Sequence, residues 1–163
     1  MREKEFNLLD EPWIRVLLPD CTVREVSLPD ALLHAQEYAD LAGEMPVQDT
    51  AILRLLLAVL HSVFGEQVSE DETDSTDDAL DLWENLWTEK RFPENPLRDY
   101  FAKWHERFWL FHPERPFWQV PQAKSGTEYT AAKLNGELSE SSNKTRLFTT
   151  FSGTGKTEMT YSQ

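Results

Sequence analysis

The sequence has little cysteine, few positive charges and no long uninterrupted hydrophobic run. A single cysteine, Cys21, excludes an internal disulfide and a cysteine-rich zinc site. Lysine and arginine number 16 against 29 aspartates and glutamates, which gives a net charge of −13. A domain that binds DNA or RNA alone usually carries a basic surface, so this balance argues against such a domain.

Segments that would direct the chain to a membrane are also missing. The sequence begins with charged residues where a signal peptide would have an apolar stretch. The longest apolar run, 52–64, is interrupted by Arg54, His61 and Ser62 and is too short to span a bilayer. We therefore expect a cytoplasmic location and no membrane partner.

The 163 residues, of which 40% are apolar and 28% charged, suffice for a globular domain with its own core. The charge is unevenly distributed along them. Residues 1–121 hold 11 basic and 25 acidic side chains, whereas residues 122–163 hold five basic and four acidic ones. A polyanionic partner would therefore meet the chain more easily at its C-terminal quarter.

Short strands are expected first. The segments 6–9 and 13–17 are rich in β-compatible residues and are separated by a turn at 10–12. A third candidate strand covers 21–26, where Val23 and Val26 alternate imperfectly. We expect these segments to form a small antiparallel meander.

Helical patterns follow the strands. Ser27, an early proline and Asp30 predict a helix start. A second helix, capped by Asp49 and ended by Gly65, is apolar on nearly every face. We therefore expect it to be the buried central helix.

Most of the aromatic residues, 11 of 19, fall within 83–118, and two further helical patterns begin in or just before this region. Helical spacing joins Ala79, Leu82, Trp83, Leu86 and Trp87 in one helix. It joins Leu97, Tyr100, Phe101, Trp104 and Phe108 in the next. Core packing is favoured over stacking on nucleic-acid bases as the role of these aromatics, because of their helical spacing and acidic surroundings. Trp109 and Trp118 fall outside the apolar face and could line a partner surface.

These patterns predict an α+β fold in which a small antiparallel N-terminal sheet packs against several helices. Residues 1–121 are expected to form the packed core. Residues 122–163 are rich in Ser, Thr, Gly and Lys and form a loop-rich segment. Because 137–157 has little apolar content, we expect it to be flexible.

Metal and catalytic motifs are weak. The four histidines (His34, His61, His105 and His112) lack a His-x-x-x-His spacing. The eight acidic residues of 66–81 lack the glycine and the ligand spacing of an EF-hand, so we interpret the stretch as a solvated loop. No metal, cofactor or catalytic residue is predicted.

The string 152–157, Ser-Gly-Thr-Gly-Lys-Thr, is similar to the end of a phosphate-binding loop. That motif needs a glycine five positions before Gly155, but Thr150 stands there, and it needs a helix after Thr157. A flexible polar loop is the favoured interpretation. A nucleotide-binding enzyme that uses this degenerate loop remains an alternative.

Two strings stand out at the ends of the packed region: Phe-Asn-Leu-Leu-Asp-Glu-Pro-Trp-Ile-Arg-Val at 6–16 and His-Pro-Glu-Arg-Pro-Phe-Trp-Gln at 112–119. The first resembles the N-terminal signature of CasA, the large subunit of the type I-E CRISPR surveillance complex Cascade. The second resembles the His-x-x-x-Pro-Phe-x-Gln segment of the same family. The resemblance covers most of this chain but only the N-terminal part of such a subunit. Without it, the two strings are a strand pair with its turn and a proline-stiffened connector.

The resemblance implies a non-catalytic piece of an RNA-guided DNA surveillance machine. Its partners would be other Cascade subunits, the CRISPR guide RNA, target double-stranded DNA and a recruited helicase-nuclease. The large subunit would contribute to recognition of the protospacer-adjacent motif, and a loop in its N-terminal domain would contact the guide-RNA 5′ end.

The matching loop is 143–155, in which Thr150 replaces the family's asparagine. The implied nucleic-acid-binding residues are a stacking aromatic, two threonines and three phosphate-facing cations: Phe148, Thr149, Thr150, Lys144, Arg146 and Lys156. The alternatives are a solvated loop at these positions and, for the whole chain, a protein-interaction domain whose acidic face meets a basic partner.

Overall fold

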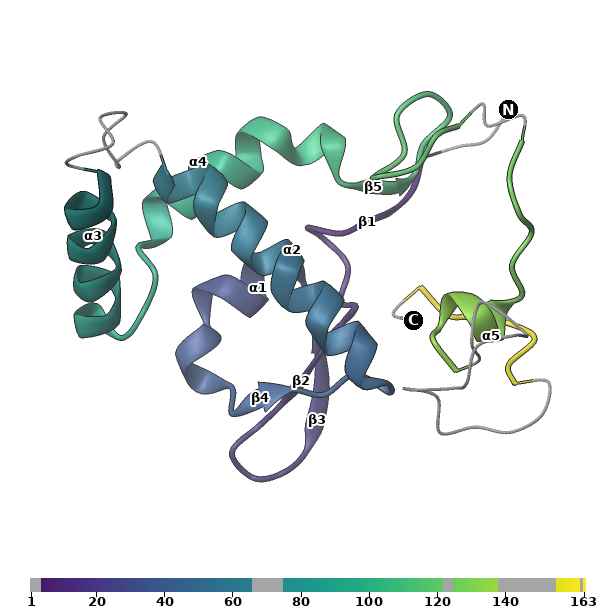
Figure 1. The fold of residues 1–163 in the computed structure, drawn as a ribbon, viewed down its shortest axis with the longest axis horizontal. Coiled ribbons are helices and arrows are strands. Elements are labelled where there is room, and N and C mark those ends of the chain that lie inside the picture. The colour runs from purple at the N-terminus through teal and green to yellow at the C-terminus, as the bar shows by residue number, and fades with distance from the viewer. Residues whose placement is uncertain (1–3, 66–74, 122–124, 138–154, 162) are drawn as a thin grey trace.

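The computed structural model describes residues 4–65, 75–121, 125–137, 155–161 and 163. The fold is α+β, as the sequence predicts (Figure 1). Its strands are β1 (Glu5–Asn7), β2 (Ile14–Leu17), β3 (Val23–Val26), β4 (Asp40–Leu41) and β5 (Trp109–Phe111). Its helices are α1 (Leu28–Leu33), α2 (Pro46–Phe64), α3 (Ser75–Glu89), α4 (Glu94–Trp104) and α5 (Ala131–Leu134), with 3-10 turns η1 (Ala35–Glu37) and η3 (His105–Arg107).

The strands form two small antiparallel sheets, so the single predicted meander is wrong in part. β2 pairs with β3, and β4 is added on the other side of β2. β1 leaves this sheet and pairs with β5, about 100 residues further along. Along β2, alternate side chains face the core, and Ile14 and Val16 are buried.

The helix starts follow the capping rules at one predicted site and depart from them at another. Ser27 Oγ accepts a hydrogen bond from Asp30 N at 3.3 Å, which confirms the predicted start of α1. The prediction that Asp49 caps α2 is wrong, because α2 already begins at Pro46. Gln48 Oε1 accepts the free amides of Glu44 and Met45, and Asp49 Oδ1 accepts Gly43 N.

The prediction that α2 is the buried central helix is wrong in part. One face, with Leu55, Val59, Leu60 and Phe64, is buried, whereas Leu53 is 52% and Leu57 41% exposed. The helix runs beyond the apolar stretch of the sequence and reaches 19 residues. By length and composition alone it could therefore cross a membrane. Its buried face packs against the helices and strands of the core.

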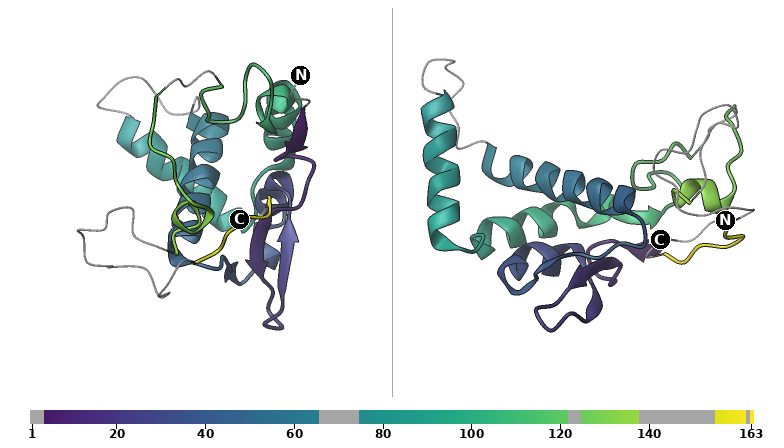
Figure 2. Two further views of the ribbon diagram at one scale, coloured as in Figure 1. Left: turned by 90° about the vertical axis from the view of Figure 1, so that its right-hand side faces the viewer. Right: turned by 60° about the horizontal axis from the view of Figure 1, so that its bottom comes forward.

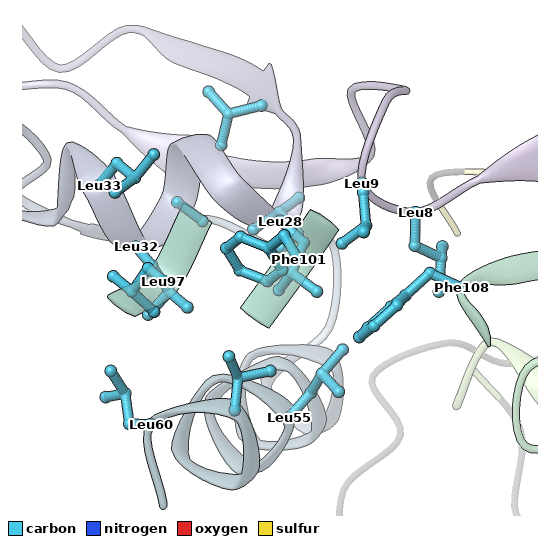
Figure 3. Close-up of a cluster of buried hydrophobic side chains, with 14 of the residues drawn as sticks. Leu8, Leu9, Leu28, Leu32, Leu33, Leu55, Leu60, Leu97, Phe101 and Phe108 are labelled. Carbon is cyan, nitrogen blue, oxygen red and sulfur yellow. The ribbon is translucent and has the colours of Figure 1, made fainter. Parts of the chain in front are cut away.

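The core lies where α4 crosses between α1 and α2 (Figure 3). Leu97 and Phe101 of α4 meet Leu28 and Leu32 of α1 on one side and Leu55 of α2 on the other. Complete burial of one such leucine contributes about 1.5–3 kcal/mol to folding. The helical stripe at 97–108 therefore has the predicted core role at Leu97, Phe101 and Phe108, but not at Trp104, which is 38% exposed. Phe108 belongs to the turn after η3.

Helices α3 and α5 lie at opposite ends of the molecule (Figures 1 and 2). The core-packing prediction for the aromatics holds for Phe101 and Phe108, which are buried, but fails for Trp87, which is 85% exposed. Trp118, predicted to lie off the core, is 77% exposed. The predicted flexibility of the C-terminal region falls mainly on 138–154, outside the described residues.

Candidate nucleic-acid interface

Of the six residues that the sequence nominates for nucleic-acid binding, the structure describes Lys156. The other five lie outside the described residues: Lys144, Arg146, Phe148, Thr149 and Thr150. The described chain nevertheless reaches both sides of this segment, at Glu137 and at Gly155. The described part of the candidate interface therefore consists of the residues on either side of this segment.

Lys156 lies between two carboxylates from distant parts of the sequence. Its ammonium donates to Glu44 and lies 3.8 Å from Glu137 Oε1. Its backbone N–H donates to Glu137 Oε2 at 2.9 Å. The Lys156 side chain is 33% exposed, whereas that of Glu137 is only 5% exposed. In this arrangement both the main chain and the side chain of Lys156 are engaged by protein groups.

The short helix α5 brings Glu137 to this position. Asn135 ends the helix, and Gly136 follows with a left-handed φ of +78°. Gly136 N donates to Lys133 O and Glu137 N donates to Ala132 O, the two bonds of a Schellman motif. A Cβ on Gly136 would lie 2.6 Å from Val47 Cγ2, so glycine is required here by both conformation and space.

Amide side chains extend the cluster to the start of α2. Asn135, which is 1% exposed, donates through Nδ2 to Glu137 Oε1 at 3.1 Å. Its Oδ1 accepts from Gln48 Nε2, and Gln48 Oε1 in turn accepts from Glu44 N. The buried polar groups of the α5 end are thus satisfied by one another and by the N-terminus of α2.

Glu44 joins the cluster to the sheet. Its carboxylate accepts from Gln163 Nε2 at 2.9 Å and lies 3.4 Å from Arg15 Nη1 on β2. The hydrogen bond from Lys156, outweighing the opposing effect of partial burial, holds the pKa of Glu44 below its ordinary value. A cavity of about 700 Å³ adjoins the cluster, lined by residues that include Arg15, Gln48 and Asn135.

The phosphate-loop interpretation of 152–157 finds no support in this geometry. A helix should follow Thr157, but residues 157–161 are not helical. The Lys156 backbone N–H, which in such a loop would face a phosphate, donates instead to a carboxylate. An anion at this position would meet both Glu44 and Glu137.

The first family-like string is a turn that joins three elements. Asn7, 2% exposed, accepts Leu9 N through Oδ1 and donates through Nδ2 to His105 O. Trp13 Nε1 donates to Leu8 O at 2.9 Å, and Asp10 pairs with His105 Nε2. The string thus fixes β1 against η3, which is a structural role.

The second string is a connector that folds back on β5. His112 Nδ1 accepts the amides of Glu114 and Arg115 at 3.1 and 2.9 Å. Phe117 stacks on Phe108 with ring centroids 5.3 Å apart, and Gln119 Nε2 donates to Leu110 O at 2.7 Å. The histidine, phenylalanine and glutamine that define the motif therefore each stabilise this connector.

Sequence reasoning missed four members of the cluster: Glu44, Gln48, Asn135 and Glu137. These residues lie up to 119 positions from their partners in the sequence, and no local pattern links them. Asn135-Gly136 after an apolar helical turn is a signal that could have revealed α5 and the direction of Glu137.

Comparison with known proteins identifies the family of this chain. The model of CRISPR-associated protein Cse1 (CRISPR_cse1) matches residues 7–163. CRISPR-associated protein CasA/Cse1 of Thermus thermophilus is 40% identical over 143 residues, which make up 87% of this chain and 26% of that relative.

Solved structures show the same architecture. The structure of Thermus thermophilus CasA (Cse1) matches with a TM-score of 0.64 and 39% identity, over 81% of this chain and 26% of that one. A chain of a CRISPR RNA-guided surveillance complex, 24% identical, shares the fold with a TM-score of 0.63 over 72% of this chain and 24% of that one. This chain spans about a quarter of the length of these relatives, and it belongs to the CRISPR-associated Cse1 family.

Proposed function

We propose that this chain is part of the large subunit of a type I-E Cascade complex and acts in cytoplasmic antiviral defence. The observation that carries the proposal is the Cse1 family match over residues 7–163. The occurrence of this fold in a CRISPR RNA-guided surveillance complex supports assembly with other Cascade subunits. Residues 1–163 would form the front of the large subunit's N-terminal domain, with 1–121 as its packed core.

Within the complex, the segment 143–155 would contact the 5′ end of the guide RNA. Phe148 would stack on a base, Lys144 and Arg146 would face phosphates, and Thr149 and Thr150 would supply hydroxyl groups. The charge distribution supports this placement, because 122–163 has five basic and four acidic residues in a chain of net charge −13. The acidic remainder would repel nucleic acid and confine contact to this quarter.

The chain's contribution would be binding and not catalysis. Guide pairing reads most of a target in RNA-guided systems, and protein reads a short flanking motif. The chain would help to position the subunit that recognises the protospacer-adjacent motif in double-stranded DNA and that recruits the helicase-nuclease. In this view the exposed aromatic residues Trp87 and Trp118 are available for protein partners.

Reconstitution of the complex with guide RNA tests the loop assignment. Phe148→Ala and Lys144→Glu, each in the full-length subunit, should weaken guide-RNA-dependent assembly by tenfold or more, since a stacked base contributes about 1–3 kcal/mol. For Lys144→Glu, the slope of log affinity against log salt should also fall by about one. Lys103→Glu on α4 makes the same charge change at an exposed site and serves as the control.

Assembly that is insensitive to both loop variants would overturn the assignment of the loop to guide RNA. Assembly that is lost equally with Lys103→Glu would instead show a general effect of negative charge. Binding of the subunit to the complex without any guide RNA would remove RNA from the proposal and leave a protein-interaction domain.

A further inference from the structure

The residues on either side of segment 138–154 are joined by one buried carboxylate. Glu137 is 4% exposed and is the last described residue before the segment. Its Oε2 accepts a hydrogen bond at 2.9 Å from the backbone N–H of Lys156, the second residue after the segment. A single side-chain hydrogen bond therefore joins two residues that are 19 positions apart in the sequence.

This closure is also attached to the body of the protein. The Lys156 ammonium donates to Glu44, and Glu44 lies 3.4 Å from Arg15 of β2. On the other side, Asn135 donates to Glu137 and accepts from Gln48 of α2. Glu137 and Lys156, the described residues near the two ends of the segment, are thus linked to α2 and β2 through side-chain contacts.

We propose that Glu137 is a positioning residue that, with Lys156 and Glu44, clamps the base of the segment and presents it to its ligand from fixed ends. The inference rests on the proposed guide-RNA contact of that segment. Lys156 then acts through the clamp and does not contact phosphate itself. Fixed ends reduce the conformational entropy that the segment loses on binding, which raises affinity without adding a contact.

The clamp and a simple electrostatic view predict opposite signs for one substitution. Glu137→Gln removes a negative charge beside a proposed RNA contact and frees the Lys156 ammonium from one of its carboxylates. Electrostatics alone would therefore make RNA-dependent assembly tighter or leave it unchanged. The clamp requires assembly to weaken, because an amide oxygen holds the Lys156 N–H less strongly than a carboxylate does.

Glu128→Gln is the matched control. Glu128 is exposed, belongs to the same C-terminal quarter, and its substitution changes the net charge by the same amount. In the reconstituted complex, Glu137→Gln should weaken guide-RNA-dependent assembly about three- to tenfold. Glu128→Gln should leave assembly unchanged or slightly tighter. Equal or tighter assembly with Glu137→Gln would overturn the proposal.

A second measurement examines the clamp without RNA. In the isolated 163-residue chain, amide hydrogen exchange at Lys156 should be slowed by its hydrogen bond to Glu137. In Glu137→Ala this exchange should be about five- to tenfold faster, whereas Glu128→Ala should leave it unchanged. Fast, unprotected exchange at Lys156 in the unmodified chain would overturn the clamp even if every variant failed to fold.

The two experiments separate this inference from the proposed function. If Phe148→Ala and Lys144→Glu leave assembly intact, the guide-RNA contact fails, and a protected Lys156 amide would still support the clamp. If those variants weaken assembly while Glu137→Gln does not, the contact stands and the clamp is wrong. Circular dichroism of each variant distinguishes lost positioning from lost folding.

Discussion

The two ends of this molecule are held by different forces. Between Leu8 and Phe108, buried apolar side chains from the turn after β1 and from β2, β3, α1, α2, α3 and α4 form one cluster. Near α5, Ala132 is the one buried apolar residue among 125–137, and its buried neighbours Asn135 and Glu137 are polar. Apolar burial is insensitive to charge, whereas a carboxylate and amide network depends on pH and salt. The apolar cluster between Leu8 and Phe108 should therefore stay folded under conditions of pH and salt that break the contacts around α5 and Lys156.

The largest expected effect is a cavity in the core. Phe101→Ala on α4 removes a ring that is 6% exposed and lies between α1 and α2, and should lower the free energy of unfolding by about 3–5 kcal/mol. Urea unfolding measures the change. Trp104→Ala on the same helix, where the side chain is 38% exposed, is the control and should cost much less. Equal losses would mean that α4 does not hold the core.

The next effect concerns the buried polar turn at Asn7. Asn7→Ala leaves Leu9 N and His105 O without the partners that the side chain provides, and should cost about 1–3 kcal/mol of stability. Asn95→Ala, at an exposed position on α4, should change the unfolding midpoint little. A neutral Asn7→Ala would show that water replaces both hydrogen bonds and that the turn does not depend on asparagine.

This contrast also explains what the sequence could predict. Periodicity found the core stripe at 97–101, because a buried helix face repeats every three to four residues. The same reasoning overestimated the burial of α2. Apolar residues lie all around this helix, but in the described structure its buried residues lie on one face. Pairing of β1 with β5 lay beyond local patterns, because nothing in 5–7 encodes a partner at 109–111.

The candidate site was predictable to an even smaller degree. The family resemblance pointed to 143–155, but the clamp joins Glu44, Glu137 and Lys156 across distances of up to 112 residues in sequence. Each of these residues alone has the sequence appearance of an exposed charge. Their meeting follows from the Schellman end of α5 and from the docking of α5 beside α2, which are tertiary events.

A smaller, pH-dependent effect distinguishes the C-terminal region from the core. Lys156→Met should lower stability by less than about 1 kcal/mol at neutral pH, since the ion pairs are partly exposed. The pKa of Glu44 is lowered in the folded state, so its contribution is present above the unfolded pKa and lost as pH falls through the folded one.

The unfolding free energies of Lys156→Met and of the unmodified chain should therefore begin to converge as the pH falls below the ordinary glutamate pKa of about 4.3, and should meet once the pH is below the lowered pKa of Glu44. Raising the salt concentration at neutral pH should reduce the difference between the two proteins in the same way. Lys103→Met on α4 controls for the loss of one positive charge. A difference that persists at a pH low enough to protonate Glu44 would show that Lys156 stabilises by packing its side chain.

The smallest expected effect concerns Tyr161, through which the C-terminal segment, residues 155–163, contacts β1. Its hydroxyl donates to Glu5, while its ring lies 4.7 Å from the Phe6 ring and 5.8 Å from the Phe111 ring. The hydrogen bond to Glu5 raises the pKa of Tyr161 above its ordinary value. The stabilisation is thus present below the unfolded pKa and is lost as pH rises through the folded one.

Ultraviolet titration should show that Tyr161 ionises above the ordinary tyrosine range and that its pKa falls in Glu5→Gln. Tyr161→Phe should remove that late step while it leaves the neutral-pH unfolding midpoint nearly unchanged, because the ring contacts remain. Glu11→Gln, an exposed carboxylate near β1, is the control. A late tyrosine that survives Glu5→Gln would mean that this end of the chain is held by ring contacts alone. The C-terminal segment would then resemble the core at this one point and differ from it only at the clamp.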